Sequence, residues 1–131
     1  MKIKIFALTH KKFEVPQDKM YQPLQVGREE KEDLGYLCDN TGDNISAENC
    51  YYSELTGLYW IWKNVHTYKY VGTCHYRRYL LNEQEKIFTE AEYLELLKDY
   101  DLITTKRVVL NNSYHYGFAT NHNIHALDMT G

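Results

Sequence analysis

Apolar and polar residues follow patterns that predict strands and helices in alternating order. Lys2–Leu8 begins with strict alternation and becomes continuously apolar, as a strand entering a buried sheet does. Tyr70–Cys74 and Asp101–Leu110 contain the β-branched and aromatic residues that favour strands. Tyr21–Gly27 predicts a short further strand, which Pro23 would confine to a sheet edge or an irregular segment.

The strongest helical pattern lies in Glu54–Val65, with Ser53 as a plausible N-cap. Its apolar residues at helical spacing predict one buried face, made of Leu55, Leu58, Tyr59 and Trp62. A second helix is predicted after Thr89, because Thr89-Glu90-Ala91-Glu92 matches a capping box, and it should run to about Lys98. Phe88 and Tyr93 are placed for a hydrophobic staple. Strands alternating with helices favour an α/β sheet with parallel crossovers.

Arg28–Asn49 is charged, rich in Asn, Asp and Gly, and shows no periodicity, which predicts an irregular functional loop or lid. Within it, CDNTGDNIS (Cys38–Ser46) presents Asp39, Asp43 and Asn44. These residue types favour turns on their own account. This segment is compatible with three interpretations: a structural turn, a site for a sugar or an acceptor, and a metal site.

Composition limits the classes of function. The chain has 131 residues and fits one domain or part of a larger one. Its net charge of −3 provides no broad positive field for nucleic acid. Three cysteines without a CxxC pair indicate free thiols in a reducing cytoplasm. No apolar run is long enough to span a bilayer, so we expect a soluble protein that can still work at a membrane surface. The final NHNIHALDMTG reads as the start of a helix, which favours a truncated piece of a longer protein.

The segment YVGTCHYRRYLL places His75, Tyr76, Arg77 and Arg78 directly after a predicted strand. In an open α/β sheet, ligands bind beyond the carboxyl ends of the strands. Two guanidiniums there suit a phosphate-bearing ligand, because each offers planar, bidentate donors. Pairing with nearby carboxylates is the competing interpretation. The histidine could orient a phosphate, transfer a proton or fill a polar niche.

Several other residues carry two interpretations. Glu54 opens a helix, where a carboxylate commonly complements the helix dipole. Tyr59, Trp60 and Trp62 favour packing over a platform for stacking sugars. His122 and His125 share one helical face, but no further zinc ligands accompany them. Lys106 and Arg107 could add charge near a phosphate or lie on a solvated edge.

The motifs IFALTHKKFEVP, QVG, TGDNIS, ELTGLYWIWKN and YVGTCHYRRYL occur here in one order. This series resembles a bacterial family of formally unknown function, encoded in capsular and exopolysaccharide biosynthesis clusters. Its members are regarded as glycosyltransferases, and some are associated with galactofuranose transfer. The resemblance covers almost the whole chain. It implies that residues 1–131 are the amino-terminal, donor-binding part of a single glycosyltransferase domain.

The resemblance implies a Rossmann-like, GT-A-like three-layer α/β fold that binds a nucleotide-sugar donor such as a UDP-sugar. Thr9 and His10 would touch the nucleotide, and Gln25, Val26 and Gly27 would flank its base or ribose. Asn44 would contribute to donor binding. Arg77 and Arg78 would neutralise the leaving diphosphate at a place where many such enzymes carry a metal-binding Asp-x-Asp motif. We expect no such motif in these 131 residues, no resident metal and no further cofactor, although a divalent ion is still compatible with the site.

An inverting transfer needs a base for the acceptor hydroxyl, and Asp43, Glu54 and His75 are the candidates. The acceptor would be a saccharide or a lipid-linked saccharide, and the protein would be cytoplasmic, with peripheral association at the inner membrane. Two other functions fit some of the same residues. The 13 tyrosines also fit a non-catalytic carbohydrate-binding module. YRRY fits single-stranded nucleic acid locally, but the net charge disfavours it.

Overall fold

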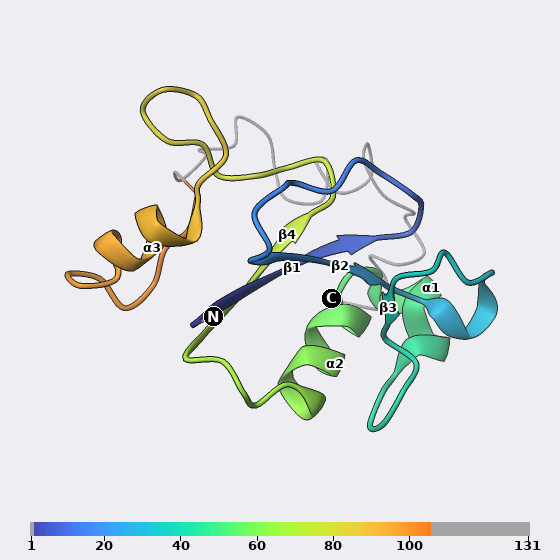
Figure 1. Ribbon diagram of the computed structural model, residues 1–131. Helices are drawn as coiled ribbons and strands as arrows, with labels where there is room; N and C mark the ends of the chain where they lie inside the picture. Colours follow the sequence, from blue (N-terminus) through green and yellow to red (C-terminus); the bar gives the residue numbers. More distant parts are fainter. Residues whose placement is uncertain (1, 106–131) are drawn as a thin grey trace, which may run out of the picture.

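The computed structural model describes residues 2–105. Four parallel strands form one sheet in the order β3-β2-β1-β4, shown in Figure 1. They are β1 (Ile3–Thr9), β2 (Tyr21–Gln25), β3 (Leu37–Cys38) and β4 (Tyr70–His75). The first and last of these lie side by side, which confirms the predicted parallel α/β sheet and the strands predicted at its centre.

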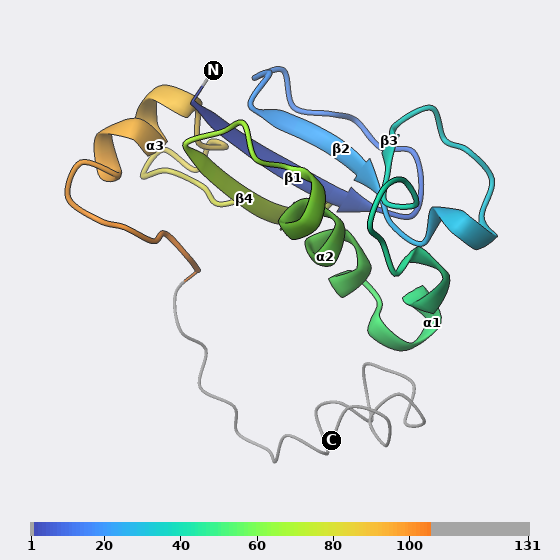
Figure 2. The same ribbon diagram turned by 90° about the horizontal axis from the view of Figure 1, so that it is seen from below.

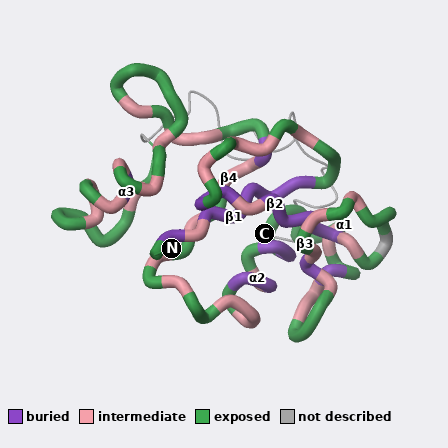
Figure 3. Tube along the Cα trace, in the orientation of Figure 1, coloured by how far each residue is buried: buried purple, intermediate pink, exposed green. Residues whose placement is uncertain are grey.

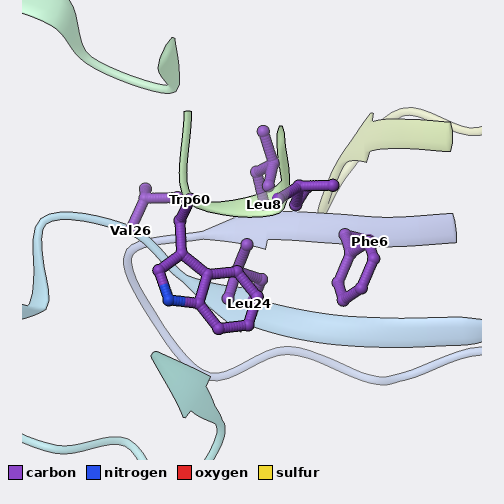
Figure 4. Packing of buried hydrophobic residues seen from close by; sticks show 6 residues of the cluster. Phe6, Leu8, Leu24, Val26 and Trp60 are labelled. Atoms are coloured by element: carbon purple, nitrogen blue, oxygen red, sulfur yellow. The ribbon is translucent and has the colours of Figure 1, made fainter. Parts of the chain in front are cut away.

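Helices lie on both faces of the sheet: α1 (Asn49–Tyr52), α2 (Leu55–Asn64) and α3 (Glu90–Leu96). Figure 2, seen from below, shows α2 in front of the sheet and α3 near the amino end of β1. On one face, Trp60 and Ile61 of α2 pack on Phe6, Leu8, Leu24 and Val26 (Figure 4). On the other face, Tyr93 of α3 packs on Ile3, Ile5, Met20 and Tyr21. The result is the expected three-layer, Rossmann-like arrangement, with burial concentrated along β1 and β2 (Figure 3).

The predicted buried face of α2 is wrong. Thr56, Gly57, Trp60 and Ile61 are buried, whereas Leu55, Leu58 and Trp62 are exposed. Close packing of the helix backbone explains the difference. A Cβ on Gly57 would lie 2.6 Å from Val26 Cγ1 and 3.0 Å from Leu8 Cδ2, so only glycine lets α2 approach the strands this closely. The large apolar residues on the other side of the helix lie outside this contact.

Pro23 was expected to confine its strand to an edge, but β2 lies between β3 and β1. The direction of the backbone N–H groups explains this position. Val26 donates its N–H to Thr9 O of β1 at 3.0 Å, so Pro23, an odd number of residues earlier, would direct an N–H to the opposite side. There β3 pairs only with Leu24 and Gln25, and the missing donor costs no ladder hydrogen bond.

The capping box of α3 is confirmed. Thr89 Oγ1 accepts from the Glu92 N–H at 3.3 Å, and Glu92 Oε1 accepts from the Thr89 N–H at 3.2 Å. The rings of Phe88 and Tyr93 stack with centroids 4.8 Å apart, as a hydrophobic staple requires. The helix ends at Leu96, earlier than the predicted Lys98.

The remaining predictions have mixed outcomes. Residues 28–48 are mostly irregular, as predicted, with short 3₁₀ turns at Arg28–Glu30 and Ser46–Glu48 and the two-residue strand β3 at Leu37–Cys38. Residues 101–105 do not form the predicted strand, and the rest of that segment lies outside the described residues. Lys106, Arg107, His122 and His125 also lie outside them. All three cysteines are free thiols, as expected.

Candidate functional site

The carboxyl ends of β1, β2 and β4 meet at one edge of the sheet, which we call the rim. Leu8 pairs with His75 in the β1–β4 ladder, and Leu8 O accepts from the Tyr76 N–H at 3.1 Å. Thr9 pairs with Gln25 in the β1–β2 ladder. The residues predicted to touch a nucleotide therefore start from the same edge as the two arginines, where α/β sheets bind their ligands.

The ring of Tyr76 is buried and gathers basic side chains around it. Its centroid lies 5.2 Å from Arg77 Cζ and 5.6 Å from Lys11 Nζ. The imidazole of His10 meets it edge-on at 5.4 Å, and that of His75 lies at 4.4 Å. Attraction between a cation and the ring face holds such groups near one another despite their like charge. Lys11 was not among the predicted site residues, although its position directly after the first strand would have suggested it.

Arg77 and Arg78 are both exposed. Within residues 2–105, the ion pairs are His75–Glu54 and Lys98–Glu95, so neither arginine has a carboxylate partner there. Arg78 also lines a hollow of about 260 Å³ together with His75, Cys74 and Thr105. This part of the molecule does not support carboxylate pairing as the role of the arginines.

His75 is held at both ring nitrogens. Nδ1 accepts from the Arg77 N–H at 3.2 Å, and Nε2 lies 3.4 Å from Glu54 Oε1. Burial lowers the pKa of His75 from its ordinary value; Glu54 opposes this shift, while the charges of Arg77, Arg78 and His10 add to it. The imidazole is therefore neutral at pH 7, with its proton on Nε2 facing the carboxylate.

This depressed pKa makes stability depend on pH. Because the folded state binds the proton of His75 less readily than the unfolded state, stability should be lost as pH falls below about 6.5. His75→Asn keeps an acceptor for the Arg77 N–H but cannot titrate. We expect the melting temperature of the wild type to fall more steeply than that of His75→Asn between pH 7 and pH 5. Parallel curves in thermal unfolding would contradict this.

Thr9 has a structural role, whereas His10 is accessible at the rim. Thr9 is buried, and its hydroxyl donates to Lys11 O while accepting from the Lys11 N–H. It therefore shapes the turn that carries His10 and Lys11. His10 is exposed above Tyr76 and can reach a ligand at the rim.

Gln25 ends β2 at the rim and Val26 and Gly27 follow it, but all three are buried. The Gln25 amide donates to Glu32 O at 2.7 Å and accepts from the Leu34 N–H at 3.0 Å. Val26 belongs to the core beneath α2. Gly27 has a φ of 67°, and a Cβ there would lie 2.5 Å from Asn49 Cγ. In the structure these residues therefore have roles in the fold. The close backbone approach that Gly27 allows is to Asn49.

Asp39 organises the loop of residues 28–49, and its carboxylate is fully buried. Its oxygens accept from the Gly27 N–H at 2.8 Å and the Arg28 N–H at 3.1 Å. They also accept from the hydroxyls of Ser46 at 2.6 Å and Thr56 at 2.7 Å. One side chain therefore ties the end of β2, the loop and α2 together. The turn chemistry of this segment was predicted, but its long-range partners were not.

Asp43 and Asn44 lie at the other end of α2 from Glu54. Asp43 accepts from the Tyr59 hydroxyl at 2.9 Å, and its carbonyl accepts from Asn64 Nδ2 at 2.8 Å. Asn44 bonds within its own turn, to Gly42 O and the Ser46 N–H. The ten residues of α2 span about 15 Å. The structure therefore does not bring Asp43 or Asn44 together with His75.

The expectation that the chain carries no Asp-x-Asp sequence needs correction, because Asp99-Tyr100-Asp101 is one. It follows α3, and Asp101 shares a hollow with Tyr70 and Val71, the first residues of β4. The same hollow runs along β4 as far as Cys74. Among residues 2–105, no three His, Cys, Asp or Glu side chains gather as a metal site would require.

Two further findings concern the thiol of Cys74 and the length of the helices. Burial raises the pKa of Cys74 to about 12, so this thiol near the rim is protonated and a poor nucleophile at neutral pH. None of the helices formed by residues 2–105 is long and apolar enough to cross a lipid bilayer.

Comparison with known proteins places the chain in a family. No curated protein matches it. The family model for a domain of unknown function, DUF4422, matches residues 4–131. The chain belongs to this family. It is also similar to a solved structure titled "WbbM bifunctional glycosytransferase apo structure", with 42% identity and a TM-score of 0.57. The match covers 61% of this chain and 14% of that one, and it relates the DUF4422 chain to a glycosyltransferase with the same kind of α/β fold.

Proposed function

We propose that this chain is the donor-binding part of a glycosyltransferase and that its rim holds the diphosphate of a nucleotide sugar. The cluster of basic side chains around Tyr76 carries this proposal. Arg77, Arg78, Lys11 and His10 lie at the carboxyl edge of a parallel sheet, and the two arginines have no carboxylate partner in the described part. The similarity to a bifunctional glycosyltransferase supports the same class of function.

The chemistry of the cluster fits a leaving diphosphate. Each guanidinium offers bidentate donors to phosphate oxygens, and each charge-assisted hydrogen bond contributes about 1.5–3 kcal/mol. Two such contacts supply a large part of the roughly 8 kcal/mol of micromolar affinity. In this proposal, the arginines take the place that Mg²⁺ or Mn²⁺ has in metal-dependent transferases. Thr9 and Gly27 support the fold around the nucleotide, and His10 lies nearest to it.

The finer assignments extend the same proposal. The donor would be a UDP-sugar, with galactofuranose as one candidate sugar. The acceptor would be a growing capsular or exopolysaccharide chain, free or linked to lipid, at the cytoplasmic face of the membrane. The resemblance to a family encoded in capsular and exopolysaccharide biosynthesis clusters supports these assignments.

Titrating UDP-galactose and UDP-galactofuranose against the full chain tests the proposal. We expect saturable binding at micromolar to millimolar concentration, unchanged by EDTA because arginines rather than a metal hold the diphosphate. A folded chain that binds neither nucleotide at millimolar concentration would exclude the function. Binding that appears only with added Mn²⁺ would exclude the metal-independent site.

A carbohydrate-binding module is the second candidate, and the aromatic residues on α2 favour it. Trp62 is 65% exposed, and its ring meets that of Tyr59 at 5.7 Å. Exposed aromatic faces of this kind can stack on sugars. This function predicts glycan binding that needs no nucleotide, is lost in Trp62→Ala and survives in Arg77→Ala.

A further inference from the structure

Glu54 and His75 are in contact, and their geometry gives them different roles in the proposed transfer reaction. His75 cannot readily accept a proton from a substrate. Its Nδ1 already accepts from the Arg77 N–H at 3.2 Å, and its Nε2 faces Glu54 Oε1 at 3.4 Å. A general base must present a free lone pair to the hydroxyl that it deprotonates. In this structure the imidazole presents none.

Glu54 has the properties that His75 lacks. Its side chain is 50% exposed, and only Oε1 faces His75, so the carboxylate is still accessible to a substrate. It does not cap α2, because no side-chain capping hydrogen bond is present at the start of that helix. The common role of a carboxylate at a helix N-terminus, capping its N–H groups, is therefore not the one seen here. The carboxylate is instead directed across to the end of β4.

The backbone before Glu54 is held in an unusual conformation. Ser53, predicted as the N-cap, has a φ of 53° and a ψ of −128°, which residues other than glycine rarely adopt. Its carbonyl accepts from Asn49 Nδ2 at 2.7 Å. Strain maintained by surrounding contacts is common at functional sites. Here it sets the direction in which the chain enters Glu54.

Basic groups lie close to His75. Arg77 and Arg78, from the turn after β4, and His10, from the loop after β1, all act electrostatically on His75. Glu54 is the acidic group facing it from α2. A carboxylate thus lies next to the cations assigned to the diphosphate. A sugar bound between them would have its leaving group near the arginines and an incoming hydroxyl near Glu54.

We propose that Glu54 is the catalytic base of the transfer and that His75 is a positioning residue that holds the Glu54 carboxylate toward the rim. This inference rests on the proposed glycosyltransferase function. The acceptor oxygen bonds to the anomeric carbon as its proton passes to the carboxylate. The bond from that carbon to the diphosphate oxygen breaks, and its electron pair leaves with UDP. Such a single displacement inverts the anomeric configuration, and Glu54 then returns the proton to solvent.

Turnover of UDP-galactofuranose and UDP-galactose by the full chain, with water or an oligosaccharide as acceptor, tests this proposal. Glu54→Gln should lower kcat about 10²- to 10⁴-fold while leaving nucleotide-sugar affinity within about threefold. Glu48→Gln, which changes an exposed glutamate outside the site, should match the wild type. His75→Asn should lower kcat less than Glu54→Gln does and leave the KM for the nucleotide sugar within about threefold, because the Glu54 carboxylate remains but loses the N–H that holds it toward the rim.

The outcomes separate this inference from the proposed function. A folded chain that binds no nucleotide sugar contradicts the function itself. Binding with no turnover, or turnover that Glu54→Gln leaves within about threefold, contradicts Glu54 as base. A product with retained anomeric configuration also contradicts Glu54 as the base of a single displacement. A rise in KM that accompanies the lower kcat of His75→Asn would give His75 a merely structural role and contradict its role in positioning Glu54.

Discussion

Asp39→Ala should destabilise the protein by about 3–5 kcal/mol, the largest effect on stability that we expect from one substitution. The carboxylate is fully buried and accepts from two backbone N–H groups and two hydroxyls. Removing it leaves these donors without partners, and each unsatisfied buried donor costs about 1–3 kcal/mol. A domain with a typical stability of about 5–15 kcal/mol would lose much of it.

Urea unfolding followed by tryptophan fluorescence measures this effect, because Trp60 lies in the core beneath α2. Asp43→Ala is the matched control: it removes an exposed carboxylate of the same loop, with one hydroxyl partner, and should cost less than about 1 kcal/mol. Asp39→Asn should fall between the two, because its NH₂ group would oppose a backbone N–H that cannot turn away. A loss below 1 kcal/mol in Asp39→Ala would show that Asp39 does not hold the loop.

Arg77→Ala and Arg78→Ala should each weaken the binding of UDP-sugars about ten- to a hundredfold. Removing a charge-assisted phosphate contact costs about 1.5–3 kcal/mol, which corresponds to this range of affinity. Both side chains are exposed and lack a carboxylate partner within residues 2–105, so unfolding free energies should change by about 0.5 kcal/mol or less. Calorimetric titration and thermal unfolding of the same variants give both quantities.

Lysine at either position should restore only part of the affinity, because a point charge cannot reproduce the bidentate fork. Lys98→Ala provides a charge-matched control, since Lys98 pairs with Glu95 at 2.9 Å on α3. It should leave binding unchanged. If the arginines were structural, their alanine variants would melt at clearly lower temperature and bind normally once folded.

Sequence patterns correctly predicted the strands and helix starts that are determined by neighbouring residues. The strands at Lys2–Leu8 and Tyr70–Cys74 came from apolar runs, and the capping box at Thr89 fixed the start of α3. The rim followed from one rule, that the carboxyl ends of parallel strands meet at one edge. The same rule placed His75, Arg77 and Arg78 at this edge, because His75 ends β4 and the arginines come shortly after it.

Features that depend on long-range packing were missed. Helix α2 has large apolar residues on more than one side, so spacing alone could not show that its smallest residues, Thr56 and Gly57, face the sheet. Pro23 is compatible with an inner strand only because β3 is so short. Asp39 draws its partners from residues as far apart as Gly27 and Thr56. No local pattern carries that information.

Comparing UDP with uridine as ligands of the full chain tests the central claim most directly. The account places the diphosphate at the rim, so UDP should bind at least tenfold more tightly than uridine, and the difference should shrink at high salt. It should also largely disappear in a variant carrying both Arg77→Ala and Arg78→Ala. Equal affinity for the two ligands in the folded wild type, or an unchanged preference for UDP in the double variant, would contradict the account.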